Sequence, residues 1–311
     1  MQFKLRGDTI LKVLLAAAAL FVIGLVVALA VELYLGGAQS IYKFGPAFLI
    51  GSKWIPSSNV LGALPFIYGT LLTSAIAIII GLPISLGVAI FITEKLKSHQ
   101  TFGYSLGIIV DLLAAVPSVI YGLWGVLILI PLLRDYVEKP LHNSLGFIPL
   151  FSGNPLGFNF FVAGIILAIM IIPTMSAVSR DVLNAVPNSQ REAMYSLGAT
   201  DWEVTQKSVL PYARSGIFAA FVLGLGRAIG ETMAVTMVIG NIPNITANLF
   251  STGYTLSSLI ANEFGDAASI SPLYESAIIE IALILFAVAL LINVLARLLL
   301  WRMNRGLQVK A

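Results

Sequence analysis

Two opposite charges stand four residues apart inside one of the most apolar stretches of the chain. They are Arg227 and Glu231, within the run Leu223-Gly-Leu-Gly-Arg-Ala-Ile-Gly-Glu-Thr-Met-Ala-Val235. On a helix this spacing brings both side chains to one face. An arginine at the centre of a membrane costs about 2.5–3.5 kcal/mol on insertion scales, so it is expected to face a partner or a water-filled path. This pair is therefore the first candidate for a functional site.

The residue types around the pair favour recognition of an oxyanion. The planar guanidinium of arginine binds tetrahedral oxyanions through paired hydrogen bonds, and glycines let the backbone approach a ligand closely. The candidate anion-binding residues are therefore Arg227, Glu231, Gly226, Gly230 and Thr232. An ionised Glu231 accepts hydrogen bonds but cannot donate them, so it would select an anion that still carries a proton. Phosphate meets this condition near neutral pH, whereas sulfate does not and would be repelled.

A structural interpretation of the same residues stays open. Arg227 and Glu231 could neutralise each other and fix helix packing, with Gly226 and Gly230 in a close helix contact of the small-xxx-small kind. Two further acidic residues in apolar stretches are equally open to a role in a substrate path or in packing, namely Asp111 and Glu280.

Other chemistries find little support. Cysteine is absent, which excludes thiolate and disulfide chemistry. The sequence contains no H-E-x-x-H metal motif and no G-x-x-x-x-G-K-[ST] phosphate loop, and its two histidines, His99 and His142, fall in opposite loops. An intramembrane aspartyl protease would need two carboxylates at one site, and Asp111 has no such neighbour. We therefore expect a chain that is not an enzyme and binds no metal or cofactor itself.

The elements that position these residues are predicted to be membrane-spanning helices. The 311-residue chain is 58% hydrophobic and 11% charged, where soluble domains carry roughly 25% charged residues. Crossing a membrane takes about 20 predominantly apolar residues of helix. We predict an all-α membrane protein, a single membrane domain over 1–311 built as a bundle of six transmembrane helices at residues 10–33, 66–92, 106–133, 160–183, 217–239 and 277–299. Within the third span, 115–122 is either a proline kink or a break.

The basic residues predict the orientation of the bundle. One side of the predicted membrane holds only Lys43, Lys53, Arg134 and Lys139, whereas the termini and the loops of the other side hold nearly all the rest. The positive-inside rule then predicts a multi-pass protein of the cytoplasmic membrane with both termini in the cytoplasm. The first span is too long for a signal peptide and is expected to be an uncleaved anchor. Residues 91–100, with Glu94, are expected to be a solvated span end.

A polar segment at 187–211 lies between the fourth and fifth predicted spans. Gly198 suits a left-handed helix cap, and Pro211 is expected to stop a second helix. Two pairs fit the capping box that starts a helix, Ser189 with Glu192 and Thr200 with Glu203. The segment is therefore predicted to form a pair of short cytoplasmic helices.

The apolar side chains of this segment need a packing partner, because short helices are marginal alone. The patterning does not decide whether that partner is the chain's own bundle or another protein. The side chains concerned are Ala193, Met194, Leu197, Trp202 and Val204.

The same segment resembles the EAA signature of ABC importer permeases. The resemblance rests on Glu192-Ala193, Gly198 and Leu210-Pro211, with Met194 and Ser208 as departures from the pattern. In that family the signature binds a groove in the ATPase subunit. The resemblance therefore implies that the cytoplasmic helix pair is a coupling element, with ATPase-coupling residues Glu192, Ala193, Gly198, Leu210 and Pro211.

Two further stretches narrow the resemblance to phosphate-specific ABC permeases. They are the fifth-span motif Gly226-Arg-Ala-Ile-Gly-Glu-Thr232 and the third-span motif Ala115-Val-Pro-Ser-Val-Ile-Tyr-Gly122, and the following Met233-Ala-Val235 is more similar to the C-type than to the A-type subunit. The resemblance implies a second homologous permease, a dimer of ATP-binding cassette ATPases that use ATP and Mg, and an extracytoplasmic phosphate-binding protein. A sulfate or molybdate permease and an ion-coupled secondary carrier or channel remain the alternatives.

Overall fold

Helices account for almost all of the regular structure in the computed structural model, which describes residues 2–97 and 100–308. Outside the helices, the described residues contain only two isolated β-bridges. The helices are α1 (Gln2–Phe44), α2 (Ala47–Ile50), α3 (Leu64–Ile90), α4 (Gln100–Ala114), α5 (Ser118–Trp124), α6 (Ile130–Leu133), α7 (Lys139–Leu145), α8 (Phe160–Asn184), α9 (Asn188–Ser196), α10 (Asp201–Val204), α11 (Leu210–Gly230), α12 (Met233–Val238), α13 (Leu256–Ile270) and α14 (Pro272–Gln308).

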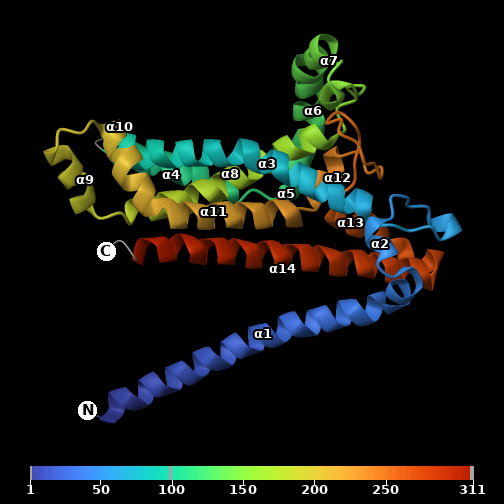
Figure 1. Ribbon diagram of the computed structural model, residues 1–311, viewed down its shortest axis with the longest axis horizontal. Coiled ribbons are helices and arrows are strands. Elements are labelled where there is room, and N and C mark those ends of the chain that lie inside the picture. Colours follow the sequence, from blue (N-terminus) through green and yellow to red (C-terminus); the bar gives the residue numbers. More distant parts are fainter. Residues whose placement is uncertain (1, 98–99, 309–311) are drawn as a thin grey trace.

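Six helical stretches are long and apolar enough to cross a membrane, which confirms the predicted fold class. In lipid an exposed backbone polar group has no water to bind, so apolar runs satisfy their peptide groups within helices. The stretches are Asp8–Phe44, Leu64–Lys95, Ser118–Leu145, Phe160–Asn184, Asp201–Gly230 and Pro272–Arg302. Figure 1 shows α3, α8, α11 and α14 running side by side, with α9 and α10 at one end and α13 at the other. We call these the α9 end and the α13 end.

The centre of the bundle is α8, which packs against α3, α11 and α4. Of its most apolar window 61% is buried, against at most 28% for the other spans. Glycines allow the close approach: a Cβ at Gly164 of α8 would overlap Ile76 of α3, and a Cβ at Gly224 of α11 would overlap Met175 of α8. Small residues at helix contacts are typical of membrane bundles, where van der Waals packing drives association.

Helix α1 lies apart from this core and packs against α14 near the α13 end (Figure 1). There the Ser276 hydroxyl donates to the Gly36 carbonyl at 2.9 Å and accepts the Ser40 N–H at 3.1 Å. From residue 8 to residue 29 every side chain of α1 is exposed in the isolated chain. This apolar surface is available to lipid or to another chain.

Aromatic side chains close the α13 end. Trp54 packs edge-on against Phe66, with ring centroids 4.9 Å apart, and lies against a buried cluster that contains Phe66 and Tyr254, the latter from the segment between α12 and α13. The Tyr254 hydroxyl donates to Glu263 of α13 at 3.2 Å. Burial raises the pKa of the Glu263 carboxyl, although the hydrogen bond from Tyr254 acts in the opposite direction.

Two of the predicted spans are not single continuous helices, which corrects the prediction. The span predicted at 106–133 is broken: α4 ends at Ala114, and Pro117 is extended (ψ 139°) where α5 begins. Proline disfavours helical backbone in the residue before it, so a break rather than a kink results. The helix that follows continues to Leu145, and Figure 1 shows α6 and α7 projecting away from the other helices. The span predicted at 217–239 is likewise divided, between α11 and α12.

Proline does not end the helix at the other end of α11, so the predicted stop at Pro211 is wrong. A wide π-helical turn, Thr205–Val209, joins α10 to α11, and the Leu210 N–H bonds to the Thr205 carbonyl. Proline has no N–H and its ring clashes with the carbonyl four residues earlier. A π-turn carries the chain past this clash within one continuous helix. Similar turns, Gly125–Leu129 and Arg134–Glu138, precede Pro131 and Pro140.

Candidate functional sites

The charged pair predicted on one helix face lies at a helix break. Helix α11 ends at Gly230, Glu231 is extended (φ −68°, ψ 129°), and α12 begins at Met233. The Glu231 carbonyl accepts a hydrogen bond from the Ser257 hydroxyl of α13 at 2.7 Å, and its Oε1 accepts the Ala234 N–H at 3.3 Å. These bonds satisfy backbone groups that the break leaves without helical partners. The expectation of a helical i, i+4 arrangement for Arg227 and Glu231 is therefore wrong.

Arg227 is half-buried near the end of α11 and has no counter-charge among the described residues. Its Nη1 donates to the Thr174 hydroxyl of α8 at 2.8 Å, and no ion pair joins it to Glu231. The interpretation of the two charges as a mutually neutralising pair is not what the structure shows. A guanidinium has five N–H donors, so most of those on Arg227 remain for a ligand.

The glycines beside Arg227 face open space. A Cβ built at Gly226 or at Gly230 meets no atom within 4 Å, so neither glycine makes a close helix contact within this chain. The small-xxx-small interpretation therefore fails inside the chain, where Gly224 makes such a contact instead. Thr232, the remaining predicted residue, is half-buried and donates to the Gly230 carbonyl at 3.2 Å.

Sequence reasoning missed the two hydroxyl residues that other helices bring to this site. Thr174 lies in the apolar run of α8, directly after Pro173, and nothing in its spacing relates it to Arg227. Ser257 follows Thr255, whose side chain caps α13 together with Ser258. A capping box predicts where α13 begins but not that this helix end meets the break at Glu231.

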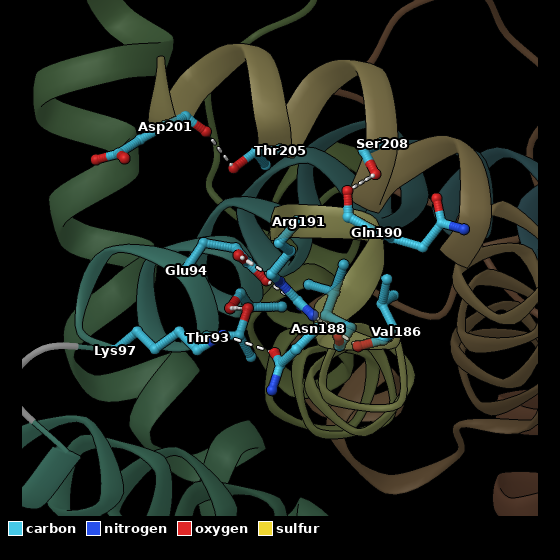
Figure 2. A network of polar contacts seen from close by, with 12 residues as sticks. Thr93, Glu94, Lys97, Val186, Asn188, Gln190, Arg191, Asp201, Thr205 and Ser208 are labelled. Atoms are coloured by element: carbon cyan, nitrogen blue, oxygen red, sulfur yellow. Dashed lines mark hydrogen bonds and ion pairs between the residues drawn. The ribbon is translucent and has the colours of Figure 1, made fainter. Parts of the chain in front are cut away.

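The polar segment forms a second site, in which Arg191 holds α9 against the bundle. Figure 2 shows its guanidinium between Glu94 and the end of α8. It makes four hydrogen bonds, two to the Glu94 carboxylate (2.7 and 3.2 Å) and one each to the carbonyls of Val186 (2.6 Å) and Leu183 (2.9 Å). The side chains of Arg191 and Glu94 are only 8% and 9% exposed. The expectation that Glu94 is solvated is therefore wrong, and sequence reasoning assigned no role to Arg191.

Weaker contacts complete the attachment of α9. The Ser208 hydroxyl donates to the Gln190 carbonyl at 3.2 Å, and Lys97 Nζ donates to Asn188 Oδ1 at 3.1 Å (Figure 2). Of the two predicted capping boxes, the one of Thr200 and Glu203 is confirmed.

The other capping box is wrong, because Pro187 precedes α9 and no side chain caps its start. Gly198 has the predicted left-handed conformation (φ +79°). It turns the chain between α9 and α10.

The segment has one face on the bundle and another exposed. Val204 is buried and Met194 packs beside it. Leu197 and Trp202, in contrast, are 83% and 54% exposed. Both packing partners considered from the sequence are thus compatible with the fold, since one face is anchored and the other is available.

The five predicted coupling residues lie in two places, on α9 with its following turn and at the start of α11. Glu192, Ala193 and Gly198 are exposed together on α9 and its following turn, whereas Leu210 is half-buried at the start of α11, beside Pro211.

The two remaining acidic candidates both contact neighbouring helices, although only Glu280 is buried and Asp111 is exposed. Asp111 of α4 forms an ion pair with Arg180 of α8. Glu280 is buried on α14, where its backbone lies 3.3 Å from a Cβ built at Gly37 of α1. Neither residue contacts Arg227.

A family model described as "Binding-protein-dependent transport system inner membrane component" matches residues 81–305. The chain belongs to this family. It is accordingly a multi-pass membrane component of a transport system. The match includes both candidate sites and leaves out α1.

Individual relatives extend the comparison. The chain is 42% identical over 304 residues to "Phosphate transport system permease protein PstC" of Xylella fastidiosa, covering 96% of this chain and 92% of the relative. It is 41% identical to the protein of that name from Haemophilus influenzae, covering 96% and 94%. A protein described as a probable PstC from Methanocaldococcus jannaschii is 39% identical, covering 89% of each. A solved chain of the inward-facing MetNI methionine ABC transporter shares the fold, with a TM-score of 0.52, 18% identity and coverage of 76% and 91%.

Proposed function

We propose that this chain is the C-type permease subunit of an ATP-driven ABC importer that carries inorganic phosphate across the cytoplasmic membrane. The observation that carries the proposal is Arg227, a half-buried cation in a membrane-spanning helix whose one hydrogen bond is to a neutral hydroxyl. An intramembrane charge without a protein partner is expected to serve a substrate path. The relatives named above as phosphate permeases support phosphate as the substrate.

The break between α11 and α12 gives the substrate its surroundings. Arg227 would bind the phosphate oxygens, because its fork of N–H donors fits a tetrahedral oxyanion. Glu231 would accept a hydrogen bond from the O–H group that phosphate carries, and Thr232 would add a hydroxyl beside it. The open space at Gly226 and Gly230 leaves room for the anion to approach the α11 backbone.

The segment around α9 would couple this path to ATP hydrolysis. Its exposed face, with Ala193, Leu197 and Trp202, offers an apolar surface to a groove of the ATPase. A helix-in-groove contact of this kind buries one helix face in an apolar cleft. Because Arg191 binds both Glu94 and the end of α8, a push on α9 would reach two spans at once.

The proposal implies partners and an orientation. The partners are a second homologous permease, a dimer of ATP-binding cassette ATPases that use ATP and Mg, and an extracytoplasmic phosphate-binding protein. Both termini and α9 would lie in the cytoplasm, and α13 would face the binding protein. This chain would hold no cofactor of its own.

Competition between anions in proteoliposomes tests the proposal. The reconstituted complex should take up radiolabelled phosphate when ATP is supplied, and excess sulfate should leave that uptake unchanged. In Glu231→Gln, which can donate a hydrogen bond, sulfate should begin to compete. The binding protein is the same in both samples, so the difference reports on the permease. Equal competition by sulfate in the unmodified complex would overturn the role of Glu231, and absence of ATP-driven phosphate uptake would overturn the function.

A further inference from the structure

A polar cavity lies at the α9 end, away from the helix break. It has a volume of about 430 Å³ and lies between α4, the end of α3, α8 and the start of α9. Arg227 is not among its lining residues. Along α8, Arg180 of the cavity is six residues beyond Thr174, roughly 9 Å at 1.5 Å per residue. Its polar lining includes Lys97, Asp111, Arg180, Asn184, Asn188 and Arg191.

The charges around the cavity do not cancel. Arg191 is neutralised by Glu94, and Arg180 by Asp111. Lys97, in contrast, donates from Nζ to the neutral amide of Asn188 at 3.1 Å and forms no ion pair among the described residues. Three cations thus stand against two carboxylates, and the cavity carries a net positive charge.

The backbone of α4 is shaped to receive Arg180. A Cβ at Gly107 would overlap Nη1 of Arg180, so the guanidinium lies against the bare backbone of α4 at this position. The Arg180 side chain is 13% exposed, and its Nε is buried without a hydrogen-bond partner in the described part of the chain. Buried donors of this kind are ordinarily paired, so the unpaired Nε points to a missing acceptor.

We propose that this cavity binds a phosphate group, supplied either by an anionic lipid headgroup or by free inorganic phosphate. Basic pockets between helices at the membrane surface recognise lipid headgroups, and lysine and arginine are the side chains that bind phosphate oxygens. The volume lies within the roughly 300–1,000 Å³ of small-ligand sites. The exposed residues Phe102, Ile109 and Leu112 of α4 offer an apolar surface along which lipid acyl chains can lie.

Occupancy of the cavity would bear on α9. A neighbouring cavity of about 350 Å³ shares Lys97, Asn188 and Arg191 with the first and extends to Glu192 and Tyr195. Arg191 therefore stands between the proposed ligand and the exposed segment. A phosphate group on Lys97 and Arg180 would link the connection between α3 and α4 to α8, beside the attachment of α9, and hold that segment against the bundle.

The test uses the purified full chain in a neutral detergent, with binding followed by native mass spectrometry and by the shift in thermal unfolding. One arm adds phosphatidylglycerol, with phosphatidylcholine as the uncharged comparison, and the other adds inorganic phosphate. Binding of phosphatidylglycerol alone identifies a lipid headgroup, and binding of inorganic phosphate alone identifies the free ion. Either result supports the site. If neither phosphatidylglycerol nor inorganic phosphate binds, the proposal is overturned.

Variants assign the binding to this cavity. Lys97→Gln should weaken it about fivefold, the effect of roughly one basic residue on an anionic surface. Asp111→Asn should strengthen it, because Arg180 loses its competing acceptor; a misfolded protein would not give this opposite sign. Lys207→Gln is the matched control, because Lys207 is exposed, pairs with Glu203 and does not line the cavity. Binding must persist in Arg227→Ala, which separates this site from the proposed transport site. Equal affinity in Lys97→Gln and the unmodified chain overturns the proposal.

Discussion

Arg227 combines two properties that are rarely found together, a position inside a membrane-spanning helix and the absence of a counter-ion among the residues that the structure describes. Its hydrogen bond to Thr174 orients the guanidinium without neutralising it. Placing a charge there is costly, and a structural residue would be expected to have a paired acid. The charge is therefore best explained by a ligand that brings its own negative charge.

Replacing Arg227 tests this explanation directly. Arg227→Ala should reduce phosphate uptake by the complex at least a hundredfold, because the site would lose its only cation, while assembly stays intact. Thr174→Val, which removes the orienting hydrogen bond but keeps the charge, should reduce uptake by about tenfold or less, in line with about 0.5–1.5 kcal/mol for one hydrogen bond. Uptake and the amount of assembled complex are measured in the same preparation. Unchanged uptake in Arg227→Ala would show that the arginine has a structural role.

The sequence predicted this residue but not its setting. A charge in an apolar run stands out because its cost is local and is read from the neighbours along the chain. The extended conformation of Glu231 depends instead on Ser257 and on the start of α12, which are tertiary contacts. The periodicity of the sequence does not reveal these tertiary contacts, and there is no proline at Gly230, Glu231 or Thr232 to mark the break.

At the scale of helices, the ends are where sequence and structure differ most. Pro117 breaks a helix, whereas Pro211 lies inside one, because a π-turn ahead of Pro211 relieves the clash that would otherwise end it. The composition predicted the apolar interiors of the spans correctly, since burial in lipid decides them. Pro83 of α3 and Pro173 of α8 lie inside helices without such a turn, so the position of a proline in the sequence does not by itself predict where a helix breaks.

The ion pair of Arg191 and Glu94 is the element-scale contact with the clearest consequence. Removing one partner of a buried pair leaves an uncompensated charge and costs about 3–5 kcal/mol. Glu94→Gln and Arg191→Gln should each lower the unfolding temperature and loosen α9. The double variant should be less destabilised than the sum of the two, because both remove the same contact. Thermal unfolding and amide exchange over α9 measure the two effects.

The exposed pair of Glu203 and Lys207 is the control for this cycle. Its side chains are 40% and 60% exposed, so Lys207→Gln, which removes the pair and leaves the capping bonds of Glu203 in place, should cost only about 0.3–0.5 kcal/mol. Additive effects of Glu94→Gln and Arg191→Gln, or effects as small as those of the control pair, would contradict this conclusion. The ion pair would then not be what holds α9 against α8 and the end of the α3 span.

At the scale of the whole molecule, the chain presents surfaces that are incomplete by themselves. Along α1, residues 13–29 are exposed and apolar, and Leu197 and Trp202 are exposed at the α9 end. A Cβ added at Gly226 or at Gly230 would meet no atom of the described residues within 4 Å, so the chain places nothing directly against these two positions. A path for a hydrated anion needs polar groups or water around its whole circumference, because the membrane interior offers neither. One chain supplies only part of that circumference.

This incompleteness distinguishes a subunit from an autonomous carrier. The purified chain alone, reconstituted in liposomes, should take up no phosphate under an ion gradient or with ATP. Uptake should appear only when the second permease, the ATPase pair and the binding protein are added and ATP is supplied. A complex carrying the Arg227→Ala variant serves as the control, since it contains every protein but lacks the cation at the helix break. Uptake by the lone chain under an ion gradient would contradict the subunit assignment and favour a secondary carrier, because only a complete path within one chain could transport without ATP.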